Sequence, residues 1–251
     1  MIDRFFKDKI SIPSIGLGTW DLRGKICRKV VQQAIEIGYR HIDTAAMYEN
    51  EKEIGQGILD STIKRKEIFL TTKINTFVVK NKNINSAFHN SLLDLKTDYV
   101  DLLLIHWPIF STNLGDMLEI LYSFKNSKKV KAIGVSNFSS NLLNECINLG
   151  FTDIFCNQVE YHPFLSQAIL IETMQKLNIM AAAYCPLCKG EVAKNKTLIE
   201  LANKYNKTAG QITLRWLVQQ KWVAIPKTEN LIRLKENINV FDFKLDDKDM
   251  E

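Results

Sequence analysis

Short apolar runs recur along the chain, and most of them are followed by a longer amphipathic segment. Each run is rich in aliphatic or β-branched residues and is bounded by turn-forming residues, a pattern typical of a buried parallel strand. Strands are predicted in this way over residues 14–18, 39–43, 68–73, 99–106, 130–136, 154–158, 179–184 and 223–227.

Segments with helical spacing of apolar residues lie between the predicted strands. After the first strand, for example, Ile26, Val30 and Ala34 fall on one stripe, and Gly38 follows as a stop signal. Helices are predicted over residues 25–37, 87–95, 141–149, 167–177, 198–205, 209–218 and 230–240.

Strands that alternate with helices predict an α/β fold, either a closed (β/α)8 TIM barrel or an open doubly wound sheet. The length of 251 residues favours the barrel, because it is close to the usual size of one barrel domain. No linker-like stretch divides the chain, so residues 1–251 are predicted to form a single domain. The residues before Ile12 are predicted to form a β-hairpin that caps the bottom of the barrel.

Composition narrows the range of functions. The net charge is +5, from 33 basic and 28 acidic residues that are scattered along the chain. Because no basic stripe with interleaved aromatic residues occurs, no nucleic-acid partner is expected, whereas an anionic small molecule suits the charge. The chain begins without a long apolar stretch and has no apolar run of membrane-spanning length, so a cytoplasmic protein without membrane contact is expected.

The five cysteines are unevenly spaced, which indicates reduced thiols in the cytoplasm. Cys185 and Cys188 form a C-x-x-C motif, which could be a redox pair, a metal site or two small residues lining a barrel. The motif lies late in a long alternating chain rather than in a thioredoxin-like context, and this favours the third interpretation.

Catalytic groups of a TIM barrel come from the C-terminal ends of its strands. The second predicted strand ends at Asp43 with Tyr48 shortly after it, the third ends at Lys73, and the fourth ends at His106. Taken singly, Asp43 could be a helix cap, Lys73 could be an ion-pair partner and His106 could be a buried core histidine. At successive strand ends that face one mouth, they are interpreted as one site.

This set suits the reduction of a carbonyl group, which needs a hydride and then a proton on the oxygen. The ammonium group of Lys73 is expected to lower the pKa of Tyr48, whose phenol then acts as general acid. Asp43 is expected to hold Lys73 in place, and His106 is expected to donate a hydrogen bond to the carbonyl oxygen.

Later strand ends are also polar. Ser136 and Asn137 follow the fifth strand, Gln158 ends the sixth and Tyr184 ends the seventh. Their hydroxyl and amide groups could hold a carboxamide while Tyr184 stacks on an aromatic ring. Alternatively, Ser136 and Asn137 form an ordinary turn and helix cap.

The last predicted strand ends at Lys227, and Arg233 lies on the helix that follows. A helix N-terminus with two cations could bind a phosphate, such as the additional phosphate of NADPH, or it could be an ordinary basic helix start. Asp21 stands where the third glycine of G-x-G-x-x-G would follow Gly16 and Gly18, so the Rossmann fingerprint is absent. A nicotinamide cofactor would therefore bind in the manner of a barrel.

Several motifs occur in an order that is specific to one family. They are GLGTW at residues 16–20, GYRHIDTAAMYENE at 38–51, TTK at 71–73, LIHWP at 104–108, GVSNF at 134–138, NQVEYHP at 157–163 and IPKT at 225–228. Together they resemble the aldo-keto reductase superfamily over nearly the whole chain, in particular its short bacterial members of the 2,5-diketo-D-gluconate reductase type.

The resemblance implies an enzyme that reduces a small-molecule carbonyl substrate with NADPH/NADP+ as cofactor and acts as a monomer. It implies a catalytic tetrad of Asp43, Tyr48, Lys73 and His106, and a substrate pocket lined by Trp20, Tyr48, His106 and Trp107. For the nicotinamide half of the cofactor, the resemblance implies that Ser136, Asn137 and Gln158 hold the carboxamide and that Tyr184 stacks beneath the ring. It places Thr19 and Asp43 near the nicotinamide ribose. For the other half, it implies that Lys227, Thr228 and Arg233 bind the 2′-phosphate and that Glu236 and Asn237 contact the adenine.

The chain departs from the family pattern in four places that bear on specificity. Cys185 replaces the serine usual after the stacking tyrosine, and Asn75 stands where many members have a pocket tryptophan. The loop over residues 109–115 is short. The chain ends at Glu251, near the start of the family's final helix, so the C-terminal loop that often sets substrate preference is expected to be missing.

Two other functions stay open. One is a cofactor-sensing regulatory subunit, a role that the family fold serves in potassium-channel β subunits. The other is a metal-dependent barrel hydrolase or isomerase. Of the four histidines, His89 lies within a predicted helix, and no H-x-H or H-E-x-x-H motif is present, so no metal site is predicted.

Overall fold

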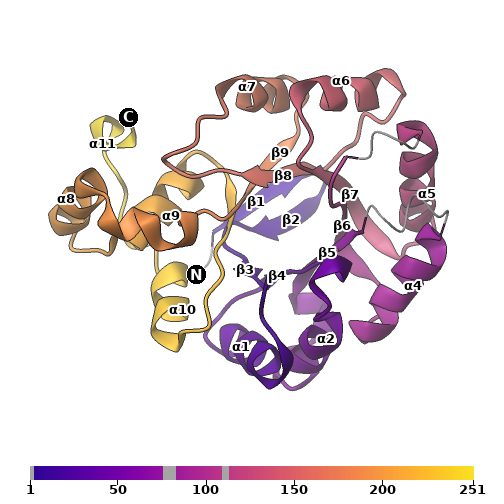
Figure 1. Ribbon diagram of the computed structural model, residues 1–251, viewed down its shortest axis with the longest axis horizontal. Helices are drawn as coiled ribbons and strands as arrows, with labels where there is room; N and C mark the ends of the chain where they lie inside the picture. Colours follow the sequence, from indigo (N-terminus) through magenta and orange to yellow (C-terminus); the bar gives the residue numbers. More distant parts are fainter. Residues whose placement is uncertain (1–2, 76–82, 109–112) are drawn as a thin grey trace.

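The computed structural model describes residues 3–75, 83–108 and 113–251, and within them eight parallel strands form the wall of a barrel (Figure 1). Each strand pairs in parallel with the next one in the sequence. The strands are β3 (Leu17–Gly18), β4 (His41–Asp43), β5 (Phe69–Ile74), β6 (Val100–Ile105), β7 (Val130–Ser136), β8 (Cys156–Glu160), β9 (Met180–Tyr184) and β10 (Val223–Ile225).

Contacts between the first and last strands close the sheet. Ile15 and Ala224 form a parallel bridge, and the Gly18 N–H donates to the Pro226 carbonyl at 2.9 Å. A Cβ atom at Gly18 would lie 3.0 Å from the Ile225 carbonyl oxygen, so the absence of a side chain allows this close approach. The prediction of a TIM barrel rather than an open sheet is confirmed.

Helices surround the barrel on its outside (Figure 1). They are α1 (Gly24–Glu36), α2 (Glu51–Leu59), α4 (Ile84–Asp94), α5 (Leu114–Asn126), α6 (Ser140–Asn148), α7 (Ala168–Lys176), α8 (Lys196–Tyr205), α9 (Ala209–Gln219), α10 (Leu231–Ile238) and α11 (Asp247–Met250), with 3-10 turns η1 (Ala46–Tyr48), η2 (Arg65–Glu67) and η3 (Cys188–Lys194). All the predicted helices are present with slightly different ends, whereas α2, α5 and the short α11 are not among the predicted ones. The short loop expected over residues 109–115 lies mostly outside the described residues.

The predicted N-terminal hairpin is confirmed. Strands β1 (Arg4–Lys7) and β2 (Ile10–Pro13) pair in antiparallel fashion. The Lys7 ammonium donates to the carbonyls of Ile154, at 2.6 Å, and Asn178, which lie just before β8 and β9. The hairpin therefore covers the end of the barrel where the strands begin.

Two apolar layers build the core. Side chains inside the barrel, including Phe69, Leu104, Phe155 and Ile225, pack with Ile12 of the hairpin. A larger cluster fills the space between the strands and the helices. Because the interior is packed and the hairpin covers one end, a ligand site is expected at the other end of the described barrel, its C-terminal mouth. None of the described helices is both long and apolar enough to cross a membrane.

Candidate active site

Four polar residues predicted from the strand ends come together at the C-terminal mouth. Asp43 ends β4, Tyr48 ends the 3-10 turn η1 that follows, Lys73 lies near the end of β5, and His106 comes directly after β6. The parallel register aligns these strand ends around the same opening.

Lys73 is the centre of this group. Its side chain is almost fully buried, and Nζ donates to Asp43 Oδ1 at 2.5 Å, to the Thr44 carbonyl at 2.9 Å and to Tyr48 Oη at 3.4 Å. Burial lowers the pKa of Lys73, but Asp43 and Tyr48 outweigh burial and hold the pKa above its ordinary value. The amine therefore carries its charge at neutral pH, and all three of its protons have acceptors.

The pKa of Tyr48 differs from the sequence-based prediction. Burial raises the pKa of the phenol, and the Lys73 ammonium lowers it by a smaller amount, so that the net shift is upward. The prediction that Lys73 brings the pKa of Tyr48 below its ordinary value is wrong, because desolvation disfavours the phenolate more than one cation favours it. Tyr48 thus keeps its proton at neutral pH.

His106 lies beside Tyr48, with the two rings edge to face and their centroids 5.5 Å apart. Burial and the charge of Lys73 lower the pKa of His106 to about 4, so the imidazole is neutral at neutral pH. A neutral imidazole carries one N–H donor. Its Nδ1 atom is buried and has no hydrogen-bond partner in the described part of the chain.

A second polar group is connected to the first by hydrogen bonds. Gln158 Nε2 donates to Asp43 Oδ2 at 2.7 Å, and Asn137 Nδ2 donates to the His106 carbonyl at 3.0 Å. Tyr184 Oη donates to Asn137 Oδ1 at 2.9 Å. The ends of β7, β8 and β9 therefore share one network with Asp43 and His106.

Two hydroxyl groups of the candidate site are bound to the backbone. Ser136 Oγ donates to the Gln158 carbonyl at 2.8 Å, and Thr19 Oγ1 donates to the Asp43 carbonyl at 2.9 Å. Both side chains are buried. Their donors thus fix the relative positions of neighbouring strand ends, and only their oxygen lone pairs remain for a ligand.

The predicted phosphate site is arranged differently from expectation. Asn230 Oδ1 accepts hydrogen bonds from the N–H groups of Ile232 and Arg233, at 2.9 and 3.1 Å. These helix N–H groups are therefore occupied, and an anion at the start of α10 would meet side chains instead. The cations are the Lys227 ammonium, 3.0 Å from a Glu229 carboxylate oxygen, and the exposed Arg233.

The remaining residues of that region are less accessible. Thr228 is buried, and its Oγ1 accepts from the Asn230 N–H at 3.1 Å. Glu236 and Asn237 lie on α10, where Glu236 is half-buried and Asn237 is buried. The main-chain carbonyl of Glu236 accepts from Gln211 of α9 at 3.3 Å.

Two large aromatic residues follow the strand ends at the mouth. Trp20 comes after Thr19 and is 58% exposed, and Trp107 comes after His106 and is 46% exposed. The rings of His106 and Trp107 are stacked, with their centroids 6.5 Å apart. Together these two exposed rings give the described part of the mouth an apolar rim.

The sequence matches the Aldo/keto reductase family over residues 14–251. The chain belongs to this family. The 9,11-endoperoxide prostaglandin H2 reductase of Trypanosoma cruzi is 41% identical over 247 residues, which span 97% of this chain and 87% of the relative. Glyoxal reductase of Bacillus subtilis is 38% identical over 243 residues, 96% of this chain and 88% of the relative.

Solved structures agree with this assignment. An aldo/keto reductase from Brucella melitensis has a TM-score of 0.95 and 37% identity, and covers 100% of this chain and 97% of its own. A protein provisionally named 2,5-diketo-D-gluconic acid reductase B has a TM-score of 0.96 and 37% identity, with coverage of 100% and 89%. The aldo-keto reductases are oxidoreductases that reduce carbonyl groups with nicotinamide cofactors, so the resemblance stated from the motifs is confirmed.

In this aldo-keto reductase, two residues that support the site were not predicted as functional. Asn50 is buried, and its Nδ2 donates to the carbonyls of Thr19 and Leu22 at 2.8 and 3.0 Å, while its Oδ1 accepts from Thr44 Oγ1 at 3.1 Å. Next to it, the carboxyl of Glu51 accepts a hydrogen bond from Thr72. The signal for them in the sequence was their position at the end of the motif over residues 38–51.

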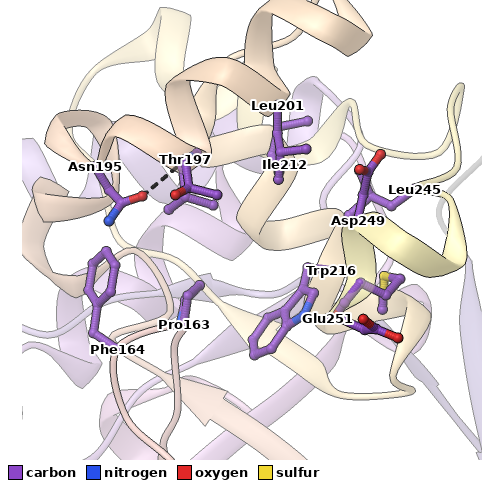
Figure 2. Close-up of a pocket in the computed structure, with 12 residues that line it drawn as sticks. Pro163, Phe164, Asn195, Thr197, Leu201, Ile212, Trp216, Leu245, Asp249 and Glu251 are labelled. Carbon is purple, nitrogen blue, oxygen red and sulfur yellow. Dashed lines mark hydrogen bonds between the residues drawn. The ribbon is translucent and has the colours of Figure 1, made fainter.

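A groove elsewhere on this aldo-keto reductase is separate from the site. It lies among α8, α9, α11 and the segment after β8, and Figure 2 shows the side chains that line it. Its lining includes Pro163, Leu201, Ile212, Trp216 and Leu245. None of the four tetrad residues lines this groove. Among the described residues, no three His, Cys, Asp or Glu side chains are grouped so that they could hold a metal ion.

Proposed function

We propose that this protein is an NADPH-dependent reductase that converts an aldehyde or ketone to the alcohol, with Tyr48 as the general acid. The observation that supports this most directly is the position of the Tyr48 phenol at the mouth, 3.4 Å from a buried Lys73 that is charged and paired with Asp43. A phenol that stays protonated beside a fixed cation can give up its proton when a substrate needs it.

The residues at the ends of β7, β8 and β9 have the chemistry to hold a nicotinamide ring. A carboxamide presents both an acceptor and donors, and Asn137 Oδ1 keeps a second lone pair while the Gln158 amide keeps a second N–H. We assign Ser136, Asn137 and Gln158 to the carboxamide, and the half-exposed ring of Tyr184 to the face of the nicotinamide. When bound there, the cofactor supplies the hydride for the carbonyl carbon.

The other end of the cofactor would lie along β10 and α10. Thr19 and Asp43 are assigned to the nicotinamide ribose, and Glu236 and Asn237 to the adenine. Lys227, Thr228 and Arg233 are assigned to the 2′-phosphate, which NADPH has and NADH lacks. The support for this assignment is that the Lys227 ammonium and the exposed Arg233 guanidinium both lie near the start of α10.

Each residue of the tetrad has a separate role in the proposed proton transfer. Tyr48 Oη gives its proton to the carbonyl oxygen, and the Lys73 ammonium stabilises the phenolate that forms. Asp43 keeps Lys73 charged and in place. Neutral His106 donates a hydrogen bond to the same oxygen, and solvent returns a proton to Tyr48 after the reaction.

An open apolar mouth favours small carbonyl compounds. Trp20, Tyr48 and Trp107 are proposed to form an apolar wall beside the nicotinamide, which predicts broad activity on small aldehydes and dicarbonyls. The relative from Bacillus subtilis is named for such a dicarbonyl, glyoxal. We propose that the enzyme acts as a cytoplasmic monomer, and its five free thiols fit a reducing compartment.

Titration with the two nicotinamide cofactors tests this proposal. Trp20 and Trp107 lie at the mouth, so cofactor binding should quench tryptophan fluorescence. We expect tight binding of NADPH, much weaker binding of NADH, and consumption of NADPH when a small aldehyde is added. If neither cofactor binds, the proposal is wrong.

A further inference from the structure

The C-x-x-C motif forms a tight turn directly after Tyr184. The Cys188 N–H donates to the Cys185 carbonyl at 2.9 Å, and Leu187 has φ −99° and ψ 11°. These values, with Pro186 at the second position, are those of a type I β-turn, in which the first and fourth Cα atoms lie within about 7 Å. A disulfide joins Cα atoms about 4.4–6.8 Å apart, so the backbone brings the two cysteines within bridging range.

The two cysteines of the turn differ from the other three in accessibility. Cys185 and Cys188 are partly exposed, whereas the remaining cysteines, Cys27, Cys146 and Cys156, are buried. Burial raises the pKa of each of those three thiols to about 12, so that they stay protonated and unreactive. An oxidant in solution therefore meets the pair in the turn first.

The Cys188 side chain also affects the pKa of Cys185. Burial raises the pKa of the Cys185 thiol, and the neighbouring Glu160 and Cys188 side chains shift the pKa in the same direction. An electrostatic effect of one sulfur on the other is expected only for nearby groups. A raised pKa also means that few Cys185 thiolates exist at neutral pH, so oxidation is slow there and faster in mild alkali.

The turn lies between the two halves of the proposed cofactor site. Tyr184, the residue before it, donates to Asn137 of the nicotinamide half. Tyr184 also pairs in register with Ile225 of β10, two residues before Lys227 of the phosphate half. On its other side, the turn packs through Leu187 and Cys188 against the apolar cluster of α8 and α9.

We propose that Cys185 and Cys188 are a redox-sensitive pair, which forms an intramolecular disulfide on exposure to a peroxide and thereby weakens cofactor binding. The first thiolate attacks one peroxide oxygen, the O–O bond breaks, and water and a sulfenic acid result. The second thiol then attacks the sulfenic sulfur, the S–S bond forms, and a second water leaves. The two thiols lose two electrons and two protons in total, and the peroxide takes up both.

The expected effect on the cofactor follows from the geometry of a disulfide. The bond requires a Cβ–S–S–Cβ dihedral near ±90° and a Cβ separation of about 3.5–4.5 Å. The Cα atoms are within range, but Cys185 and Cys188 both have positive φ angles, 51° and 45°, an uncommon backbone conformation, and we expect the turn to adjust its backbone when the bond adopts its preferred dihedral. The shift occurs next to Tyr184, so the proposed support for the nicotinamide ring moves. This second part of the proposal rests on the proposed function.

Peptide mapping tests the disulfide independently of any activity. The intact protein is treated with hydrogen peroxide, remaining thiols are alkylated, and trypsin is added. Cleavage after Lys176 and Lys189 releases one peptide, residues 177–189, that contains both cysteines. We expect this peptide to lose two hydrogen atoms and to escape alkylation, and dithiothreitol to reverse the change. Two alkylated cysteines, or separate oxidation products on each, would overturn the proposal.

Cofactor titration of the same samples tests the second part. We expect oxidation to weaken NADPH binding by about 10-fold, equivalent to about 1.4 kcal/mol, with recovery after dithiothreitol. Cys188→Ser is the matched control, because it removes one sulfur and lies outside the proposed cofactor contacts. It should bind NADPH normally before and after peroxide. A disulfide that leaves NADPH affinity unchanged would overturn the second part, whereas failure of the reduced protein to bind NADPH would contradict the proposed function instead.

Discussion

Burial of Tyr48 and the charge of Lys73 shift the pKa of the Tyr48 phenol in opposite directions. Burial raises its pKa more than Lys73 lowers it, so the acid is protonated at neutral pH. In the proposed mechanism, Lys73 acts mainly at the moment when the proton leaves, because its charge lies 3.4 Å from the phenol oxygen, which would then become negative. The arrangement favours donation of a proton over storage of a phenolate.

The pH dependence of reduction follows from two of these groups. His106 has a pKa of about 4, and the pKa of Tyr48 lies above its ordinary value, so neither titrates between roughly pH 5 and 9. We expect kcat/KM for reduction to be flat over this range and to fall only at higher pH, where the phenol loses its proton. Measurement of kcat/KM across the range checks this. A decrease centred near pH 6.5 would show that His106 titrates normally and would contradict the account.

Replacement of Lys73 by Met should slow the reaction without removing the acid. The change removes the cation that stabilises the phenolate and raises the pKa of Tyr48 further. We expect kcat to fall by about 10²–10³-fold, the loss typical of one electrostatic contact to a developing charge.

Lys131→Met is the matched control, because the Lys131 ammonium also pairs with an aspartate, Asp101 at 2.7 Å, but far from the tetrad. It should retain its kcat. Circular dichroism establishes that both variants fold. A folded Lys73→Met protein with normal kcat would exclude the proposed role.

For single residues, the sequence predicted which side chains of the tetrad lie together, but not how their surroundings shift their pKa values. Asp43, Lys73 and His106 could be found because strand ends of a barrel share one mouth. The direction of the Tyr48 pKa shift could not, since desolvation depends on neighbours that only the folded chain supplies. The same holds for Asn50, which donates two hydrogen bonds to carbonyls far away in the sequence, those of Thr19 and Leu22.

Among the elements, α2 shows why a helix can escape prediction. Its sequence contains Gly55 and Gly57, which lower intrinsic helix propensity. In the folded protein, both glycines allow close packing: a Cβ atom would lie 2.5 Å from the Asp94 carbonyl oxygen at Gly55 and 2.7 Å from the Arg28 carbonyl oxygen at Gly57. By contrast, α5 has a clear apolar stripe of Met117, Leu118, Leu121 and Phe124, and its spacing would have identified it.

Substitution of Gly55 by Ala should therefore destabilise the protein, although alanine is the better helix former. The added methyl group meets backbone of α4, and relief of such a clash costs about 1–3 kcal/mol. Urea unfolding measures the change in the free energy of unfolding.

Gly210→Ala is the control, because Gly210 also lies in a helix, α9, but a Cβ atom there has no neighbour closer than 3.7 Å. We expect that variant to be unchanged or more stable by up to about 1 kcal/mol. Equal stability of both variants would mean that α2 does not pack as closely as described.

In the whole molecule, the proposed cofactor site extends from the tetrad, past β9, to the start of α10. Alternation of strands and helices predicted the barrel and its mouth, and the position of β10 beside β3 and β9 follows from closure. The sequence pattern did not predict which hydrogen-bond donors at the start of α10 are already paired within the protein. Asn230 caps the N–H groups of α10, and Glu229 pairs with Lys227, so of the three residues proposed for the 2′-phosphate we expect Arg233 to contribute most to selectivity.

Arg233→Ala should separate the two cofactors. On the proposed assignment, loss of the guanidinium would remove charge-assisted hydrogen bonds to the 2′-phosphate, and we expect the Kd for NADPH to rise by about 10–100-fold. The Kd for NADH should stay unchanged. Lys235→Ala is the control, since Lys235 is an exposed cation on the same helix. Equal weakening of both cofactors by Arg233→Ala would contradict the assignment of this residue to the 2′-phosphate.

The central claim is that Tyr48 supplies the proton in a carbonyl reduction. Its most direct test is to compare the wild-type protein with Tyr48→Phe, which removes one hydroxyl group and keeps the ring against His106. Consumption of NADPH is followed with small aldehydes and dicarbonyls, and NADPH binding is measured in parallel by tryptophan fluorescence. The account predicts that the variant binds NADPH like the wild type and loses at least about 10²-fold in turnover. A variant that binds NADPH and turns over at the wild-type rate would show that Tyr48 is not the acid.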